Sequence, residues 1–318
     1  MRTAAFAAAA VTVAVLVSQA IEIFINRVLR PNAAELSWIS EAIMAAAFLV
    51  MTTLWVRLRR TRRELSEAQR VRVALETQLA VAASVQRALL PPTPEPIDGI
   101  AWFAAVEPAG LVGGDYYDFV RLSDGNMCVV LGDVSGKGIA AAVFLSNVRA
   151  LVRALLRETH LPADLLRRLS DAVLEDSRAG LYVTCFLAIV DTRARLLTYA
   201  NAGHPTGVII GNGGVRALDV GGPPAGLLPT PHYQAADVTL ADDEVVVIVS
   251  DGITEALDTG GTRIPSALAS AIGTTGPRSP EAVGLRLFAA AQGGLGPDGV
   301  ADWSDDRTVV TFGAALDT

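Results

Sequence analysis

The chain has 318 residues, and its 33 acidic and 26 basic side chains give a net charge of −7. A hydrophobic content of 51% and a mean hydropathy of +0.40 exclude an intrinsically disordered chain. The two cysteines exclude a disulfide scaffold and a four-cysteine zinc site. The charge is uneven, because residues 1–90 carry 11 arginines against 6 glutamates, whereas residues 91–318 carry 15 basic against 27 acidic residues. The acidic second part disfavours nucleic-acid binding, which depends on contacts between basic side chains and phosphates.

Two apolar segments predict a transmembrane hairpin over residues 1–57. Residues 3–21 carry no charge and residues 36–56 carry only Glu41, and each length is close to the roughly 20 residues that cross a bilayer as a helix. Five arginines follow the second segment directly and mark the cytoplasmic side: Arg57, Arg59, Arg60, Arg62 and Arg63. We therefore expect a two-pass protein of the plasma membrane whose C-terminal domain is cytoplasmic. The alternative is a cleaved signal peptide ending near Ala20, which would leave the domain on the same side.

Residues 58–90 contain neither glycine nor proline and predict one helical linker. Leucines and alanines recur at heptad spacing, but Arg72 and Gln86 interrupt the seam, so the coiled-coil signal is weak. One interpretation is a signalling helix that forms a homodimer, and the other is a helix that packs on its own domain. Pro91 and Pro92 predict a sharp helix end.

Residues 91–318 predict a second domain of α+β class, with strands, a helix pair, further strands and a terminal helix. The expected strands are 100–107, 116–122, 127–133, 182–191, 195–201, 207–210, 233–240, 244–250 and 308–312. The expected helices are 137–158, 162–178 and 276–292. Asp124-Gly125-Asn126 predicts a hairpin turn.

Four acidic motifs stand where predicted strands end or begin. They are Gly113–Asp118, Gly132–Gly138, Ser250-Asp251-Gly252 and Asp305–Thr308. Several carboxylates brought together repel one another unless a cation neutralises them. Hard oxygen donors without a Cys/His cluster favour Mg²⁺ or Mn²⁺ over Zn²⁺, and a pair of such ions can activate a water for in-line attack on phosphorus.

Each motif alone has an ordinary explanation, since Asp251-Gly252 is a common turn pair and Asp305-Asp306 fits a solvated loop. Gly132–Gly138 is one residue short of a P-loop and ends on glycine instead of Ser/Thr, so we exclude it. Gly113-Gly114-Asp115 also resembles the start of the GGDEF signature of diguanylate cyclases, but tyrosines replace the expected Glu and Phe. The cyclase remains an alternative that predicts GTP consumption.

Taken in order, the motifs resemble those of the SpoIIE/RsbU-like branch of the PPM-type (2C-class) metal-dependent serine/threonine phosphatases. The motifs that carry the resemblance are Gly113–Asp118, Gly132–Gly138, Asn201–Pro205, Pro223–Leu227, Ser250–Ala256 and Asp305–Val310. The segment Ala82–Pro92 resembles the helix that precedes the catalytic domain in that family. The resemblance covers roughly residues 80–316 and implies an α-β-β-α sandwich with two divalent cations, Mn²⁺ or Mg²⁺, between its sheets.

The resemblance also implies a ligand set. Asp133 would bridge both ions, Asp115 would hold one, and Asp251 and Asp305 would hold the other. The backbone carbonyl of Val134 would add a ligand, and Asp118 and Asp306 are candidates for the outer shell of hydrogen bonds.

The chain departs from the family's eukaryotic members, which carry DGHGG with a histidine proposed as general acid. The aligned stretch here has Ser135 and Lys137 and no histidine, so we assign no side-chain general acid. Lys137, the one lysine of the chain, could attract the substrate phosphate or cap the helix that follows. His204 fits a structural hydrogen-bonding role better than catalysis, and Cys128 and Cys185 fit an apolar core.

These observations favour a membrane-anchored protein phosphatase. The resemblance implies a phosphorylated STAS-domain anti-anti-sigma factor of a partner-switching pathway as its substrate. The alternative from another class is a catalytically silent receptor scaffold, or pseudophosphatase, that binds regulatory partners.

Overall fold

The computed structural model describes residues 15–24, 27, 33–176, 180–205, 207–257, 264–273, 278–291 and 305–314. The chain divides into two compact units, Met1–Glu76 and Thr77–Thr318. The second unit therefore includes the last turns of the long helix α2 (Ala33–Leu89) as well as all the strands and the helices that follow them.

The first unit is helical where it is described. Val15–Phe24 forms a short apolar helix, and most of the predicted first span lies outside the described residues. Within the part of the chain that the structure describes, one helix, Glu41–Leu89, is long and apolar enough to cross a membrane. The second predicted span and the predicted linker form one continuous helix of 57 residues. The predicted helix end before Pro91 is confirmed, because α2 ends at Leu89.

The second unit contains two mostly antiparallel sheets. The first has the order β1 (Ile100–Glu107), β11 (Arg307–Ala314), β10 (Val245–Val249), β6 (Gly207–Gly211) and β7 (Gly214–Leu218). The second has the order β2 (Asp115–Arg121), β3 (Met127–Val134), β4 (Val183–Asp191), β5 (Leu196–Ala202) and β8 (Gly221–Gly222), with β9 (Ala236–Thr239) also paired to β5.

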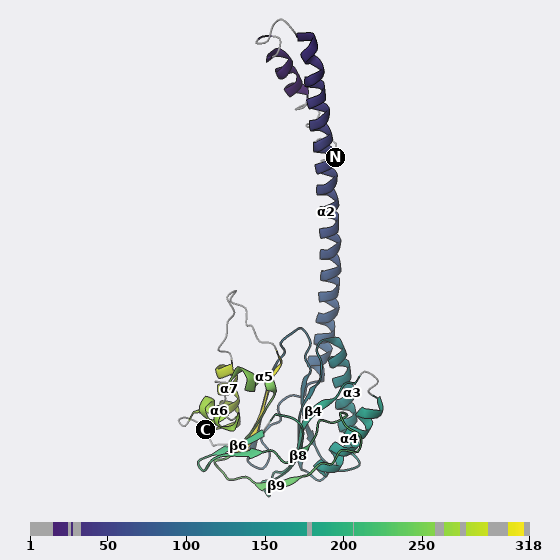
Figure 1. Ribbon diagram of the computed structural model, residues 1–318. Coiled ribbons are helices and arrows are strands. Elements are labelled where there is room, and N and C mark those ends of the chain that lie inside the picture. The colour runs from purple at the N-terminus through teal and green to yellow at the C-terminus, as the bar shows by residue number, and fades with distance from the viewer. Residues whose placement is uncertain are drawn as a thin grey trace. The chain divides into compact units, whose positions relative to one another are not determined.

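Helices cover the outer face of each sheet (Figure 1). The pair α3 (Ile139–Leu155) and α4 (Pro162–Asp176) packs on the second sheet, and α6 (Ile264–Ile272) and α7 (Pro280–Ala291) pack on the first, beside the short α5 (Asp251–Ala256). A third apolar cluster fills the space between the sheets. The central strands are buried on both faces, which explains continuous apolar runs such as the VVVIV of β10. The predicted α-β-β-α sandwich is confirmed.

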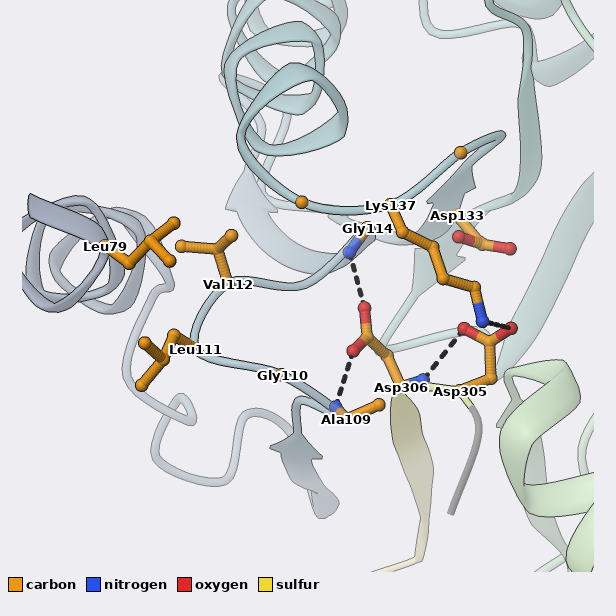
Figure 2. A pocket seen from close by; sticks show the side chains of 12 residues that line it. Leu79, Ala109, Gly110, Leu111, Val112, Gly114, Asp133, Lys137, Asp305 and Asp306 are labelled. Atoms are coloured by element: carbon orange, nitrogen blue, oxygen red, sulfur yellow. Dashed lines mark hydrogen bonds and ion pairs between the residues drawn. The ribbon is translucent and has the colours of Figure 1, made fainter. Parts of the chain in front are cut away.

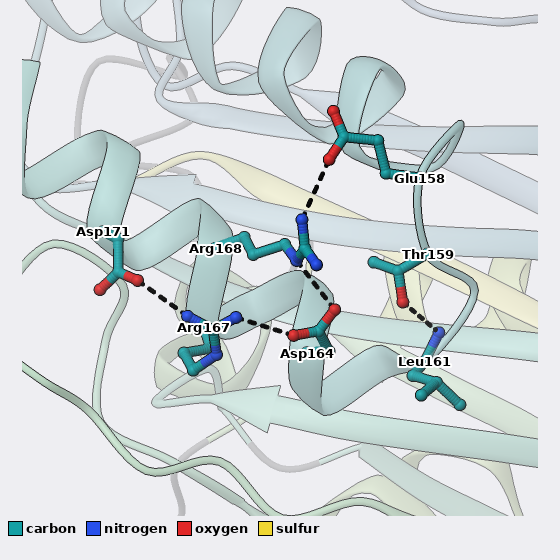
Figure 3. Close-up of polar contacts among 7 residues, drawn as sticks. All are labelled: Glu158, Thr159, Leu161, Asp164, Arg167, Arg168 and Asp171. Atoms are coloured by element: carbon teal, nitrogen blue, oxygen red, sulfur yellow. Dashed lines mark hydrogen bonds and ion pairs between the residues drawn. The ribbon is translucent and has the colours of Figure 1, made fainter.

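Charged side chains surround the connection between α3 and α4 (Figure 3). The backbone N–H of Leu161 donates to Thr159 Oγ1 just before α4 begins. Arg168 bridges Glu158 and Asp164, and Arg167 bridges Asp164 and Asp171. These pairs are largely exposed, so each contributes little to stability. Together they surround the connection between α3 and α4.

The sequence prediction missed the strands β7 and β8 and the helices α5 and α6, and it made β9 too long. Strand β8 consists of two glycines, which have low strand propensity, and tertiary pairing with β5 overrides that preference. Helix α5 starts at Asp251, where Asp-Gly was interpreted as the end of a strand. The Asp124–Asn126 turn is confirmed, with the N–H of Asn126 donating to Asp124 Oδ1 at 3.0 Å.

Candidate active site

Strands β2 and β3 bring the first two predicted ligands together. Their antiparallel register makes Asp115 and Asp133 direct Cα partners. Asp115 is the first residue of β2 and is buried, and Thr308 Oγ1 donates to its Oδ2 at 2.6 Å. The two motifs thus meet at one end of the sheet, as the sequence prediction required.

Asp251 and Asp305 come from the other sheet. Asp251 starts α5 directly after β10, and Asp305 lies two residues before β11. Ser250 joins these segments, because its hydroxyl donates to the carbonyl of Asp306 and accepts from the N–H of Thr308. Gly252 permits the close approach, since a Cβ there would collide with the Asp306 carbonyl. Ser250 was not singled out in the sequence, although it precedes the acid of its motif.

The four acids form one electrostatic neighbourhood. Burial and the carboxylates of Asp251 and Asp305 raise the pKa of Asp133 to about 7. Burial and the carboxylate of Asp133 raise the pKa of Asp115 well above its ordinary value. Burial and the carboxylate of Asp305 also raise the pKa of Asp251. Mutual repulsion of this kind is relieved by a cation, so the donor chemistry fits Mg²⁺ or Mn²⁺.

The backbone around the acids also fits a cation. At Gly114, a Cβ would lie 3.0 Å from the Val134 carbonyl oxygen and 3.1 Å from Asp133 Oδ1. Glycine therefore leaves both oxygens open on the same side. Among the residues that the structure describes, no three Asp, Glu, His or Cys side chains are close enough to enclose one ion. Asp133 and Asp305 line one cavity, and the described acids do not form a closed cage.

Asp306 has different surroundings from Asp305. It is buried, and its carboxylate accepts backbone N–H groups from Ala109 at 2.7 Å and from Gly114 (Figure 2). The N–H of Asp115 donates to the same carboxylate at 3.3 Å. Asp306 therefore anchors the loop between β1 and β2 from both ends. Asp305 and Asp306 both line the cavity that Asp133 also lines, but the carboxylate of Asp305 accepts from Lys137.

Gln86 of α2 holds the same loop, and sequence reasoning did not assign it a role. Its Nε2 donates to the carbonyl of Gly113 at 2.6 Å, and its Oε1 accepts the N–H of Gly113 at 3.1 Å. Nearby Ala83 packs against Val112 and Ala142. The last turns of α2 thus pack on their own domain, as one of the two linker interpretations predicted. The sequence signal for this role is that Gln86 is a polar residue in the apolar segment before Pro91.

Lys137 lies at the mouth of the cavity. Its Nζ donates to Asp305 Oδ2 at 3.0 Å, and its side chain is 66% exposed. The residue at the N-cap position of α3 is Gly138. Lys137 therefore contacts a predicted ligand and remains accessible to a substrate phosphate.

The structure gives Asp118 a different role from the predicted one. Asp118 lies three residues after Asp115 on β2. Because side chains alternate along a strand, the two side chains leave opposite faces of the sheet. Asp118 is fully buried and accepts from Arg153 at 2.7 and 2.8 Å, with Arg149 at 3.6 Å. It attaches α3 to the sheet, and these contacts do not support the expected place in the outer shell of the metal site.

His204 has the structural role that the sequence favoured. It is buried, its Nε2–H donates to the Val249 carbonyl at 3.1 Å, and its Nδ1 accepts from the Thr184 hydroxyl at 3.1 Å. Burial lowers the pKa of the ring to about 3, so the ring is neutral near pH 7. The imidazole thus connects the two sheets through β4 and β10. Cys128 and Cys185 are buried, as predicted.

Comparison with solved structures shows which fold this is. The SiaA-PP2C domain of Pseudomonas aeruginosa superposes with a TM-score of 0.62 at 21% identity, covering 77% of this chain and 99% of that one. RsbX in complex with magnesium gives a TM-score of 0.50 at 16% identity, covering 70% of this chain and 98% of that one. The sandwich is therefore a PP2C-type phosphatase fold.

Sequence comparison agrees. The chain is 28% identical over 183 residues to "Phosphoserine phosphatase RsbU" of Bacillus subtilis, which covers 57% of this chain and 54% of RsbU. The chain thus spans about half the length of that relative. Residues 123–314, which include Asp133, Asp251 and Asp305, match the family described as Stage II sporulation protein E (SpoIIE). This match extends over more than half of the chain, and the chain belongs to the SpoIIE family.

Proposed function

We propose that the protein is a metal-dependent serine/threonine protein phosphatase that hydrolyses a phosphomonoester on a cytoplasmic regulatory protein. The observation that carries the proposal is the meeting of Asp115, Asp133, Asp251 and Asp305 at one end of a PP2C-type sandwich. Membership of the SpoIIE family and similarity to a relative named phosphoserine phosphatase support the same chemistry.

The acids would hold two divalent cations, Mn²⁺ or Mg²⁺. Asp133 would serve both ions, a role supported by its proximity to the other acids: Asp251 and Asp305 help to raise its pKa, and it helps to raise the pKa of Asp115. Asp115 and the Val134 carbonyl would serve one ion, and Asp251 and Asp305 the other. When bound, such a pair supplies Lewis-acid activation of water for attack on phosphorus.

The chain's own groups account for positioning. Lys137 places a positive charge beside Asp305 at the cavity mouth, where it can attract an incoming phosphate. Asp306 and Gln86 fix the loop that carries Gly114, and Gly114 leaves the Val134 carbonyl accessible. We assign no side chain as general acid.

The proposed substrate is a phosphorylated STAS-domain anti-anti-sigma factor of a partner-switching pathway. Similarity to RsbU supports this assignment. We also propose a two-pass plasma-membrane protein with a cytoplasmic catalytic domain, in which α2 relays a signal and can dimerise. The apolar window in α2 and its five following arginines support this topology.

The first test is Mn²⁺-dependent hydrolysis of p-nitrophenyl phosphate by the purified full chain in detergent micelles, with Asp133→Asn as the paired variant. We expect turnover by the wild type and a loss of at least about a hundredfold in the variant. No turnover by the wild type, or equal turnover in Asp133→Asn, would support the silent scaffold instead.

The second test addresses the substrate and the membrane side. Incubation with phosphorylated STAS proteins from the same organism should release phosphate from one of them in the presence of Mn²⁺ and from none in EDTA. External protease should spare the catalytic domain in spheroplasts and digest it in inverted vesicles. Digestion in intact spheroplasts would reject the proposed topology.

A further inference from the structure

The cavity that two of the predicted ligands, Asp133 and Asp305, line has two unlike walls. Its volume is about 340 Å³, and Asp133, Asp305 and Lys137 line one part of it. Leu79, Leu111 and Val112 line another part (Figure 2). Figure 2 shows these three apolar side chains gathered on one side, with the carboxylates and the lysine on the other. A phosphate group requires the charged part alone.

The apolar wall is built on a rigid segment. Val112 is 6% exposed and packs against Ala83 and Ala142, whereas its neighbour Leu111 is 47% exposed. The loop that carries both is held by the double hydrogen bond of Gln86 to Gly113 and by Asp306. An accessible leucine on a segment fixed from both ends is organised in advance for contact, so little ordering entropy opposes binding.

The position of the wall relative to the phosphate site limits what can lie against it. Because the two parts belong to one cavity, a substrate side chain on Leu111 lies near the phosphate that Lys137 attracts, and in an extended substrate segment such a side chain belongs to a neighbour of the phosphoserine. An acidic or amide side chain there would lose its water against Leu79 and Val112 without gaining a partner from them. An aliphatic or aromatic side chain would bury apolar surface.

We propose that Leu111, with Leu79 and Val112, forms a specificity subsite for an apolar side chain that flanks the phosphoserine of the substrate protein. This inference rests on the proposed phosphatase function and adds the local chemistry of the substrate. The phosphate determines where the peptide is anchored, and the subsite selects among phosphoserines by their neighbours.

The test uses the full chain in detergent micelles with Mn²⁺ and nonapeptides that carry one central phosphoserine. Paired peptides place Leu or Asp at each flanking position in turn, and kcat/KM is measured for each. For at least one position we expect the Leu peptide to be preferred about tenfold, which is typical of one apolar contact in a pocket. A ratio within twofold at every position would overturn the proposal.

Substitution assigns the preference to the subsite. Leu111→Asp should bring the Leu-to-Asp ratio to one or below, and Leu111→Ala should reduce it partly. The matched control is Leu161→Asp, an exposed leucine outside this cavity, which should keep the ratio of the wild type. Because the ratio compares two peptides on one protein, a general loss of folding or metal cancels. An unchanged ratio in Leu111→Asp would contradict the subsite.

A binding measurement separates this inference from the phosphatase proposal. Fluorescent Leu and Asp peptides with a non-hydrolysable difluoromethylene phosphonate in place of the phosphate are titrated with the wild type. Preference for the Leu peptide without turnover of any phosphopeptide would support the subsite and reject the enzyme. Turnover of the peptides with equal binding and equal kcat/KM would support the enzyme and reject the subsite.

Discussion

Two aspartates on one strand of the protein lie in opposite electrostatic surroundings. Asp115 faces other carboxylates, and burial together with Asp133 raises its pKa well above the ordinary value. Asp118, three residues along β2, is fully buried against Arg153 and Arg149 on the other face. Asp115 receives a hydroxyl hydrogen bond from Thr308 that offsets its raised pKa only in part, whereas Asp118 is paired with arginine.

The difference shows how one strand serves function and stability at once. A protein gains nothing in stability from gathering like charges, so the surroundings of Asp115 make sense where an external cation completes the site. The ion pair of Asp118 with Arg153 instead attaches α3, the helix that starts after Lys137, to the second sheet. Replacing an aspartate is therefore expected to lower activity on one face of β2 and to lower stability on the other.

The largest effect is expected for Asp115→Asn. The amide oxygen can still accept from Thr308, but the charge is lost, so activity should fall by about a hundredfold to a thousandfold. The unfolding temperature in EDTA should rise by about 2–4 °C, because repulsion with Asp133 is removed. Activity is measured with p-nitrophenyl phosphate and stability by circular dichroism. A lower unfolding temperature in EDTA would show that the carboxylate stabilises the metal-free fold.

Asp118→Asn is the matched substitution on the other face. It removes a buried charge with two hydrogen bonds from Arg153, so the free energy of unfolding should fall by about 3 kcal/mol. The melting temperature should drop by roughly 6–12 °C for a domain of this size. The ligand neighbourhood is left intact, so turnover per folded molecule should stay within about threefold, less than 1 kcal/mol. Loss of activity without loss of stability would return Asp118 to the metal site.

His204 tests a third kind of buried ionisable group, one held neutral by burial. Its folded pKa of about 3 lies below the ordinary 6.5, so the unfolded chain takes up a proton first as the pH falls. This contribution to stability is fully present above pH 6.5 and is lost progressively as the pH falls toward 3. Between pH 7 and pH 5 the loss of this contribution should amount to about 2 kcal/mol.

The measurement is urea unfolding at several pH values in EDTA, for the wild type and for His204→Asn. The variant should start less stable and should lose about 2 kcal/mol less than the wild type between pH 7 and 5. Parallel curves for the two proteins would mean that the imidazole titrates alike in the folded and unfolded states.

The smallest effect is expected for Lys137→Arg. The side chain is 66% exposed and its contact with Asp305 is a surface ion pair, which is worth at most about 1 kcal/mol. We expect kcat/KM to change by less than about fivefold, mainly through KM. A larger loss in kcat would show that the compact ammonium of the chain's one lysine has a part that the guanidinium cannot take.

Most of the sandwich could be predicted because its strands and helices carry strong local signals. The buried runs of β3 and β10, the Asp124–Asn126 turn and the prolines after α2 each specify their structure within a few residues. Strands β7 and β8 could not be predicted, because glycine-rich segments pair only when neighbouring strands supply the partners. The start of helix α5 at Asp251 could not be predicted, because the Asp-Gly pair found there is also common in turns.

Some residues of the candidate site could likewise be predicted from the sequence, and others could not. The alternation of side chains along a strand was available in the sequence and already separated Asp115 from Asp118, but the presence of both acids in one motif obscured it. Gln86 and Ser250 could not be assigned, because each binds backbone groups that the folded chain alone brings near.

The sequence by itself determined most of the longer elements, the acids near the strand ends and the place where the long helix stops, because these depend on neighbours in the chain. The tertiary structure decided which acids face one another, which pair with arginine and which backbone groups hold the loop beside Leu111. Those outcomes depend on strand register and on contacts between segments up to about two hundred residues apart, as in the bond from Asp306 to Ala109. Local preference carries no information about such distances, and packing of the two sheets supplies it.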